Sequence, residues 1–341
     1  ELADTPWAPV LRLALAADKQ KRPASAAALA RALEEVTVRA IDDDVTPYPG
    51  LASFSAEDAE NFFGRELEVE ALWKKLRRLH LLGLIGPSGT GKTSFLRAGL
   101  LPAKPFGWGV LFTTPGVRPF TALADTLADA LADELARESA AEADVLRDLI
   151  GFEDPDRAVA VVRRWRDRHD RAILVVDQFE ELFTQNPPEV QRRFAELLGR
   201  LSVEADVRVL LSLRDDFLNY CGQQPALTPI FEALTLLNPL TGSALRRAVV
   251  QPALRHGYRF EDEALVEEIL DEVEGERGAL PLLAFAAAEL WRRRDRDRGL
   301  LTREAYQEIG GVGGALARHA ETTLERIGHD RIPLVQELFR H

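Results

Sequence analysis

The chain has 341 residues, enough for about two or three domains, and its 46% hydrophobic and 29% charged residues exclude a disordered protein. With 55 acidic and 43 basic residues the net charge is −12, which argues against charge-driven nucleic-acid binding as the main function. The single cysteine, Cys221, excludes an intrachain disulfide.

The first residues, Glu1-Leu2-Ala3-Asp4, lack the basic start and apolar core of a signal peptide, and no apolar run has the length of a transmembrane helix. We therefore expect a cytoplasmic protein without a membrane segment. No methionine occurs, even at position 1, so we expect the chain to be a segment of a longer protein.

The start of the chain has the pattern of helices followed by a linker. Residues 7–35 have the apolar spacing of two helices, with a break at Lys21-Arg22-Pro23. Residues 36–50 hold an acidic triplet, two prolines and a glycine, which indicates a linker.

From residue 51 to residue 240, strand and helix patterns alternate. The apolar run at 80–85 predicts a strand that is buried on both faces. Four more strands are expected at 110–114, 172–176, 207–213 and 234–237. Helices are expected near 66–77, 120–137, 143–150, 157–168 and 188–203. This alternation predicts an α/β fold with a parallel sheet. Residues 242–341, in contrast, have an all-helical pattern.

The strand at 80–85 leads directly into a sequence that fits the Walker A pattern G-x-x-x-x-G-K-[ST] at every position. Glycines let backbone N–H groups surround a polyphosphate, and the helix expected at 92–99 points its amino end at the same anion. Lys92 would bind the β and γ phosphates, and the Thr93 hydroxyl would be a ligand of Mg²⁺. The predicted nucleotide-binding residues of this loop are Gly86, Ser88, Gly89, Thr90, Gly91, Lys92, Thr93 and Ser94. The alternative is a plain glycine turn between a strand and a helix.

The apolar strand at 172–176 ends in an acid, Asp177, which predicts the second ligand of the metal, through water or through Thr93. A capping residue for the next helix is the alternative. Glu180 and Glu181 follow, and one of them is a candidate base that polarises the attacking water. Both could instead belong to a solvated helix start, and Gln178 occupies the place where many hydrolytic relatives have a glutamate.

Arg214 ends the strand at 207–213, at the edge of the sheet where the phosphates are expected. Its guanidinium could therefore contact the γ-phosphate and distinguish ATP from ADP. The alternative is an ion pair with Asp215 or Asp216.

Taken in order, six segments resemble the STAND class of signalling NTPases, and most closely its bacterial novel STAND branch. The resemblance covers about residues 47–341 and rests on Pro47–Leu51, Phe62–Glu66, the loop at 86–93, Asp177–Phe183, Leu213–Phe217 and Gly278–Leu282. It implies a five-stranded parallel sheet of order 5-1-4-3-2 in a P-loop NTPase core at 51–240. A helical lid at 241–300 and the start of a winged helix at 301–341 would follow.

The resemblance also implies roles for residues outside the Walker motifs. Phe63, Gly64 and Arg65 resemble the segment that lines the adenine pocket, and Pro281 resembles the proline that closes over the nucleotide. From the residues alone, Pro281 could simply be a proline in the first turn of a helix. The class implies ATP or ADP with Mg²⁺, and self-association in the ATP state.

Residues 1–35 resemble the last helices of a protein-kinase domain, through Asp18, Arg22-Pro23 and Ser25, without any kinase catalytic signature. Relatives with this layout often continue into repeats that sense a ligand. The sequence therefore predicts an ATPase that hydrolyses ATP slowly and couples its nucleotide state to flanking kinase and sensor domains. The alternative is a scaffold between those domains that binds nucleotide without hydrolysing it.

Overall fold

The computed structural model describes residues 46–135, 154–273 and 278–327, together with residues 14, 15, 25 and 337. The kinase-like helices, most of the linker and the helix expected at 143–150 lie outside the described residues. The described chain forms two compact units. The sheet unit consists of Ser53–Ala59 and Arg65–Leu240, and the helical unit consists of residues 46–52, 60–64 and the described residues from Thr241 onward.

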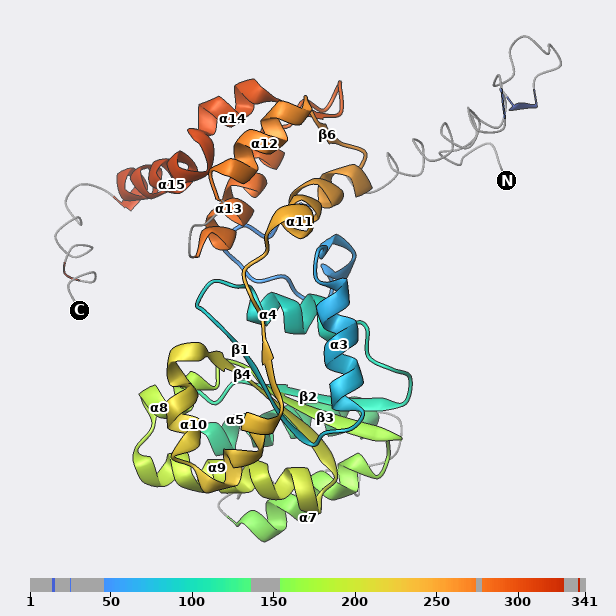
Figure 1. The fold of residues 1–341 in the computed structure, drawn as a ribbon, viewed down its shortest axis with the longest axis vertical. Helices are drawn as coiled ribbons and strands as arrows, with labels where there is room; N and C mark the ends of the chain where they lie inside the picture. Colours follow the sequence, from blue (N-terminus) through green and yellow to red (C-terminus); the bar gives the residue numbers. More distant parts are fainter. Residues whose placement is uncertain are drawn as a thin grey trace. The chain divides into compact units, whose positions relative to one another are not determined.

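A five-stranded sheet is the centre of the sheet unit, and its strand order is β2-β3-β4-β1-β5 (Figure 1). Every neighbouring pair is parallel. Both the α/β class and the predicted order 5-1-4-3-2 are thus confirmed. The strands are β1 (Leu81–Gly86), β2 (Trp108–Thr113), β3 (Arg171–Val176), β4 (Val207–Arg214) and β5 (Leu234–Leu236).

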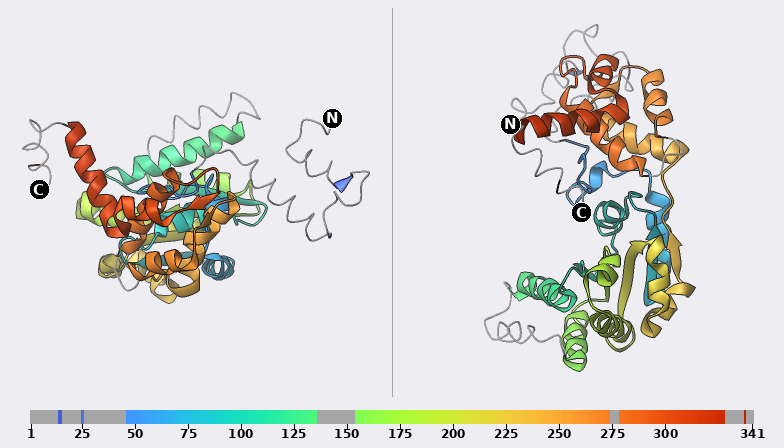
Figure 2. Two further views of the ribbon diagram at one scale, coloured as in Figure 1. Left: turned by 90° about the horizontal axis from the view of Figure 1, so that it is seen from above. Right: turned by 90° about the vertical axis from the view of Figure 1, so that its left-hand side faces the viewer.

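Helices cover both faces of this sheet (Figures 1 and 2). One face packs against α3 (Glu66–Leu76) and against α4 (Lys92–Ser94), which continues into the π-helical segment η3 (Phe95–Leu100). The other face carries the hydrophobic core that Leu174, Val176 and Leu211 share with the remaining helices. Those are α5 (Pro119–Leu135), α7 (Pro155–Arg166), α8 (Glu180–Gln185), α9 (Pro188–Glu204), η5 (Asp215–Phe217), α10 (Leu218–Gly222) and η6 (Pro225–Glu232).

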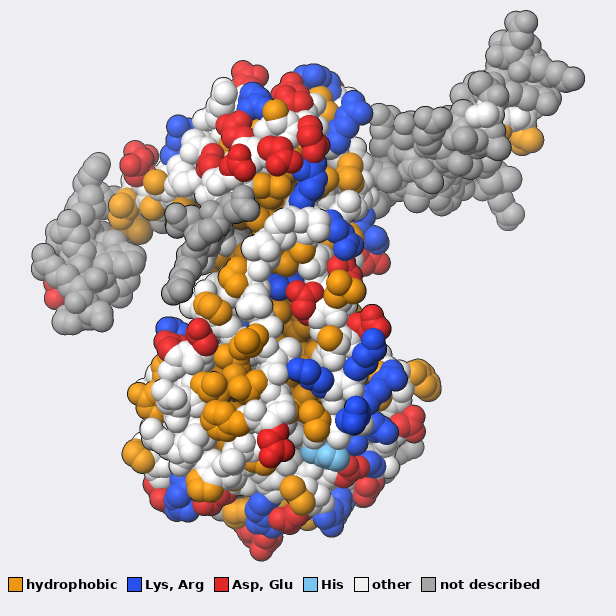
Figure 3. All heavy atoms as spheres, in the orientation of Figure 1, with side chains coloured by type: hydrophobic (Ala, Val, Ile, Leu, Met, Phe, Trp, Pro, Cys, Tyr) orange, Lys and Arg blue, Asp and Glu red, His pale blue; other side chains and the backbone are white. Residues whose placement is uncertain are grey.

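Helices that run against parallel strands end at the amino edge of the sheet, where their carbonyl ends place partial negative charge. In the structure, arginine side chains donate hydrogen bonds to these carbonyl ends. Arg171 donates from Nη1 to the carbonyl oxygen of Arg77 (2.9 Å), directly after α3, and Arg163 donates from Nε to that of Glu204 (2.8 Å), at the end of α9. Basic side chains also gather along the side of the sheet unit where α3 runs, although the chain as a whole is acidic (Figure 3).

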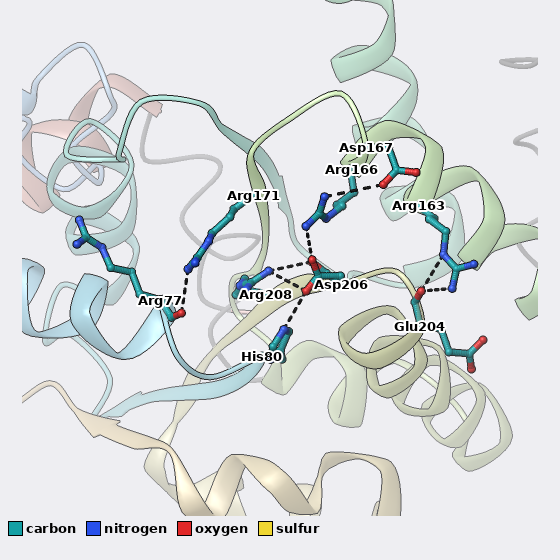
Figure 4. Close-up of polar contacts among 9 residues, drawn as sticks. All are labelled: Arg77, His80, Arg163, Arg166, Asp167, Arg171, Glu204, Asp206 and Arg208. Carbon is teal, nitrogen blue, oxygen red and sulfur yellow. Dashed lines mark hydrogen bonds and ion pairs between the residues drawn. The ribbon is translucent and has the colours of Figure 1, made fainter.

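One carboxylate organises the cations at this edge, and we call it with its partners the amino-edge cluster: Asp206, His80, Arg166 and Arg208 (Figure 4). Asp206 accepts from His80 Nε2 at 2.9 Å, from Arg208 Nη1 at 3.0 Å, and from Arg166. Burial opposes ionisation of Asp206, but the hydrogen bonds from His80 and Arg166 outweigh it, so its pKa lies below the usual value. The backbone of Asp206 has φ +52°, a left-handed conformation.

The helical unit is not entirely helical, which corrects the all-helical prediction for residues 242–341. Arg259–Phe260 (β6) pairs in parallel with Leu300–Leu301 (β7). Strands of two residues are too short to produce an alternating pattern, so they could not be predicted from the sequence. The helices are α11 (Gly242–Arg255), α12 (Glu263–Asp271), α13 (Ala279–Arg292), α14 (Arg303–Ile309) and α15 (Gly311–Ile327), and a short turn, η2 (Ala59–Asn61), comes before α3.

The segment around Tyr48 is part of the core of the helical unit. Tyr48 is 3% exposed, donates its hydroxyl to the carbonyl oxygen of Val249 at 2.5 Å, and lies edge-on to Trp291 at 6.2 Å. Burial raises the pKa of Tyr48 well above its usual value. The Pro47–Leu51 motif therefore anchors the chain to α11 and α13, a role that the sequence did not suggest.

The amino-edge cluster yields a test of stability. Asn tolerates the left-handed backbone at position 206, so Asp206→Asn removes the charge without adding strain. Because the carboxylate is half-exposed, we expect a loss of only about 1 kcal/mol in the free energy of unfolding at pH 7, measured by urea denaturation. A carboxylate whose pKa is lowered by folding stabilises the fold fully above its unfolded-state pKa and loses that contribution as the pH falls through its folded-state pKa. The difference between the two proteins should therefore begin to shrink near pH 4 and disappear below the lowered pKa of Asp206. A constant difference down to pH 3 would contradict this account.

Candidate functional site

The predicted phosphate loop lies at the carboxyl end of β1, and its geometry requires glycine at two places for two different reasons. A Cβ on Gly86 would lie 2.5 Å from the carbonyl oxygen of Leu237, so the close approach of the chain after β5 excludes a side chain. Gly91 directly precedes α4 and has φ +83°, a left-handed backbone conformation that is strained for any residue with a side chain. Within the loop, Thr90 donates its hydroxyl to the carbonyl oxygen of Pro87 at 2.9 Å.

Lys92 bends over the start of the loop. Its Nζ donates to the carbonyl oxygens of Gly86 at 2.7 Å and Pro87 at 3.0 Å. Burial lowers the pKa of Lys92, and the nearby carboxylates of Glu180 and Asp177 oppose this shift. The ammonium group is thus held at the place where the pattern predicts phosphate.

Thr93 and Asp177, the two residues predicted to bind metal, are in direct contact. The hydroxyl of Thr93 donates to Oδ2 of Asp177 at 2.8 Å, and Asp177 is 2% exposed. Oδ1 of Asp177 is buried and has no hydrogen-bond partner among the described residues. No side chain caps α8, so Asp177 is not a helix cap. A hydroxyl beside a carboxylate with an unused oxygen is a donor set that suits Mg²⁺.

The two glutamates at the start of α8 have different surroundings. Oε2 of Glu180 accepts from the backbone N of Arg214 at 3.3 Å, and burial raises the pKa of Glu180 although Lys92 lies close enough to oppose the shift. Oε2 of Glu181 instead accepts from the backbone N of Gly116 at 3.2 Å, in the loop between β2 and α5. Only Glu180 therefore faces the phosphate loop.

Arg214 lies at the same edge, and its side chain is paired. Nε and Nη2 donate to the two carboxylate oxygens of Asp216 at 3.0 and 2.6 Å, which raises the pKa of Arg214 further. This is the ion pair that the sequence left open as an alternative. Both side chains are about half exposed, so the pair is weak.

Two other predicted site residues fix the loop from outside. Arg65 is 4% exposed and donates to the carbonyl oxygens of Thr90 at 3.3 Å and Asn238 at 2.7 Å, which ties the loop to the segment after β5. The hydroxyl of Ser94 accepts from the backbone N of Phe54 at 3.1 Å.

The remaining predicted residues belong to the helical unit. Gly64 has φ +91°, and a Cβ there would lie 2.5 Å from the carbonyl oxygen of Ala244, so glycine is required within this unit. Phe63 precedes it. Pro281 is the third residue of α13, which agrees with the alternative of a proline in a first helical turn.

Two features at the carboxyl ends of β3 and β4 were not predicted from the sequence. Ser212 is completely buried in β4, and its hydroxyl has no hydrogen-bond partner among the described residues. Gln178 has φ +49°, a strained conformation directly after Asp177, and the backbone N of Phe179 then donates to the carbonyl oxygen of Ser212 at 2.8 Å. Only the alternation along β4 could have indicated that Ser212 shares a face with Arg208 and Leu210.

The described residues contain no group of three or more His, Cys, Asp or Glu side chains that could hold a metal by themselves. In the same ranges, none of the helices combines the length and the hydrophobicity that are needed to cross a membrane.

Several solved structures are similar to the fold of this chain. The Walker-type ATPase PABY2304 of Pyrococcus abyssi matches with a TM-score of 0.53 and 17% identity, over 87% of this chain and 79% of that one. Cdc6p from Pyrobaculum aerophilum matches with a TM-score of 0.43 and 18% identity, over 73% of this chain and 63% of that one. AMPPCP-bound DnaA from Aquifex aeolicus has a TM-score of 0.37 and 20% identity, over 70% and 69%.

No curated protein matches the chain by sequence. A family model, in contrast, matches residues 47–341 and therefore most of the chain; its description is novel STAND NTPase 1. That range includes the phosphate loop, Asp177 and Arg214. The chain thus belongs to the novel STAND NTPase 1 family and is a nucleotide-binding NTPase.

Proposed function

We propose that this protein is an ATP-binding signalling switch that hydrolyses ATP slowly in the presence of Mg²⁺. The observation that carries the proposal is the contact between Thr93 and Asp177 beside the Lys92 ammonium, because it joins the phosphate loop and the acid that follows β3 in one site. Lys92 would neutralise charge on the β and γ phosphates, with the backbone of Gly86–Thr93 around them. Ser88, Gly89 and Gly91 would contribute N–H groups.

Thr93 and Asp177 would hold Mg²⁺, which when bound neutralises phosphate charge and orients the phosphates. Glu180 would take a proton from water as the water oxygen bonds to the γ-phosphorus and the bond to the bridging oxygen breaks. Its raised pKa and its position near Lys92 support this assignment over Glu181. Glu181 would position the loop at Gly116 instead.

Arg214 would contact the γ-phosphate and so distinguish ATP from ADP. To reach it, the guanidinium must leave Asp216, which costs little because the pair is half-exposed. Such a difference between the ATP and ADP states suffices to shift a balanced equilibrium between two conformations. Phe63, Gly64 and Arg65 are proposed for the adenine side, and Pro281 for coupling to the helical unit.

The finer biological role rests on resemblance. We propose the domain division at residues 51–240, 241–300 and 301–341, with the last segment beginning a winged helix. The kinase-like residues 1–35 support coupling to a kinase domain, with a sensor domain beyond, in a cytoplasmic protein that self-associates in its ATP state.

A scaffold that never turns ATP over is the competing function, and single-turnover release of phosphate separates the two. The scaffold is correct if wild type releases no phosphate while Lys92→Ala and Asp177→Ala both lose nucleotide.

Substitution of Lys92 tests whether the loop binds phosphate. The compact ammonium fits between two carbonyl oxygens 2.7 and 3.0 Å away, and a planar guanidinium cannot occupy that place. Lys92→Arg should therefore lower ATP affinity at least about tenfold, or about 1.4 kcal/mol, by calorimetric titration. Lys74→Arg, on the exposed side of α3, is the matched control and should bind normally. Near-wild-type affinity of Lys92→Arg would mean that the loop is not the phosphate site.

Two further substitutions distinguish the adjacent glutamates Glu180 and Glu181. Glu180→Gln should lower the rate of ATP hydrolysis about a hundredfold while nucleotide affinity changes little, because it removes the base but keeps the shape. Glu181→Gln should lower it less than about tenfold. Wild-type hydrolysis should rise with pH through the elevated pKa of Glu180, as the carboxylate form becomes populated, and the Glu180→Gln variant should lack this rise. Equal losses in the two variants would refute the assignment.

A further inference from the structure

β4 lies between β1, which leads into the phosphate loop, and β3, which leads into Asp177 (Figure 1). The phosphate loop follows β1 on one side of it, and Asp177 follows β3 on the other. The hydrogen bond of 2.8 Å between Thr93 and Asp177 therefore has to pass over the carboxyl end of β4. The residues of β4 at this end are Ser212, Leu213 and Arg214.

The strand register decides which of these side chains lies on the face of Asp177. Val175 pairs with Leu210, and paired residues of parallel strands point to the same face. The last pair in the register is Val176 and Leu211, and Asp177 and Ser212 are the next residues of the two segments, so we expect their side chains on the face of Val175 and Leu210. Leu213, one residue later, belongs to the hydrophobic core on the opposite face.

Asp177 and Ser212 each have a buried polar atom at the carboxyl ends of these neighbouring strands. Asp177 is 2% exposed and Ser212 is 0% exposed. Neither Oδ1 of Asp177 nor Oγ of Ser212 has a hydrogen-bond partner among the described residues. Buried polar groups without a partner destabilise a fold, so each one needs an explanation, and a role in ligand binding is one of them.

On the basis of the proposed function, we infer that Ser212 is a positioning residue for the magnesium ion. Its hydroxyl and Oδ1 of Asp177 form an acceptor pair for a water molecule of the metal's hydration shell. Mg²⁺ keeps several of its waters when it is bound by protein, so acceptors behind the direct ligands help to orient it. Ser212 then sets the affinity for Mg²⁺ without touching nucleotide.

This role separates function from stability, because the same hydroxyl helps to bind metal and costs stability when no metal is bound. Ser212→Ala in the full chain should raise the Mg²⁺ concentration for half-maximal binding of a fluorescent ATP analogue about fivefold. Its urea unfolding midpoint, in EDTA and without nucleotide, should equal or exceed that of wild type. Ser212→Cys keeps the volume with a weak acceptor and should show the same loss of Mg²⁺ affinity.

Ser202→Ala is the matched control, because Ser202 is 5% exposed and its hydroxyl donates to the carbonyl oxygen of Gly199 at 2.7 Å. Its unfolding midpoint should fall and its Mg²⁺ dependence should stay unchanged. Unchanged Mg²⁺ dependence in both Ser212 variants, or a lower midpoint of Ser212→Ala without ligand, would overturn the inference. If wild type itself binds no ATP analogue with Mg²⁺, the proposed function fails instead.

Discussion

The hydrogen bond from Thr93 to Asp177 joins two segments that are 84 residues apart in sequence, and the rest of the sheet unit serves to make it possible. It requires β1 and β3 to end at the same edge, with β4 between them. That order in turn requires helices to cross over both faces of the sheet and to end at the opposite edge. At that edge Arg171 and Arg163 donate to the carbonyl oxygens at the ends of α3 and α9 and so offset the partial negative charge that this arrangement creates there.

Charge is distributed unevenly around the site itself. Lys92 and Arg214 are surrounded by Asp177, Glu180 and Asp215, which all influence the Lys92 ammonium. Burial disfavours the charged forms of both Lys92 and Glu180, so each shifts toward neutrality. A site of this kind gains from a bound cation beside the phosphates, since the added anion alone would increase repulsion with the carboxylates.

The strands of the sheet and the phosphate loop could be predicted from the sequence, because strands buried on both faces are long apolar runs and the phosphate loop has a fixed sequence pattern. The strand order followed from the resemblance and proved correct. The difference between Glu180 and Glu181 could not be predicted, because neighbouring residues at a helix start point about 100° apart and only the packed structure shows which way each faces. The β6–β7 pair and the anchoring of Tyr48 depend on contacts between residues far apart in sequence, and no local pattern records them.

The stretch from Tyr48 to Arg65 alternates between the two units, since residues 46–52 and 60–64 belong to the helical unit and Ser53–Ala59 to the sheet unit. Neither unit is therefore a continuous piece of chain. Exchange of one unit between related genes would need several coordinated crossovers, whereas most domains can be swapped with two. The two units are thus expected to be inherited together, as a single cassette.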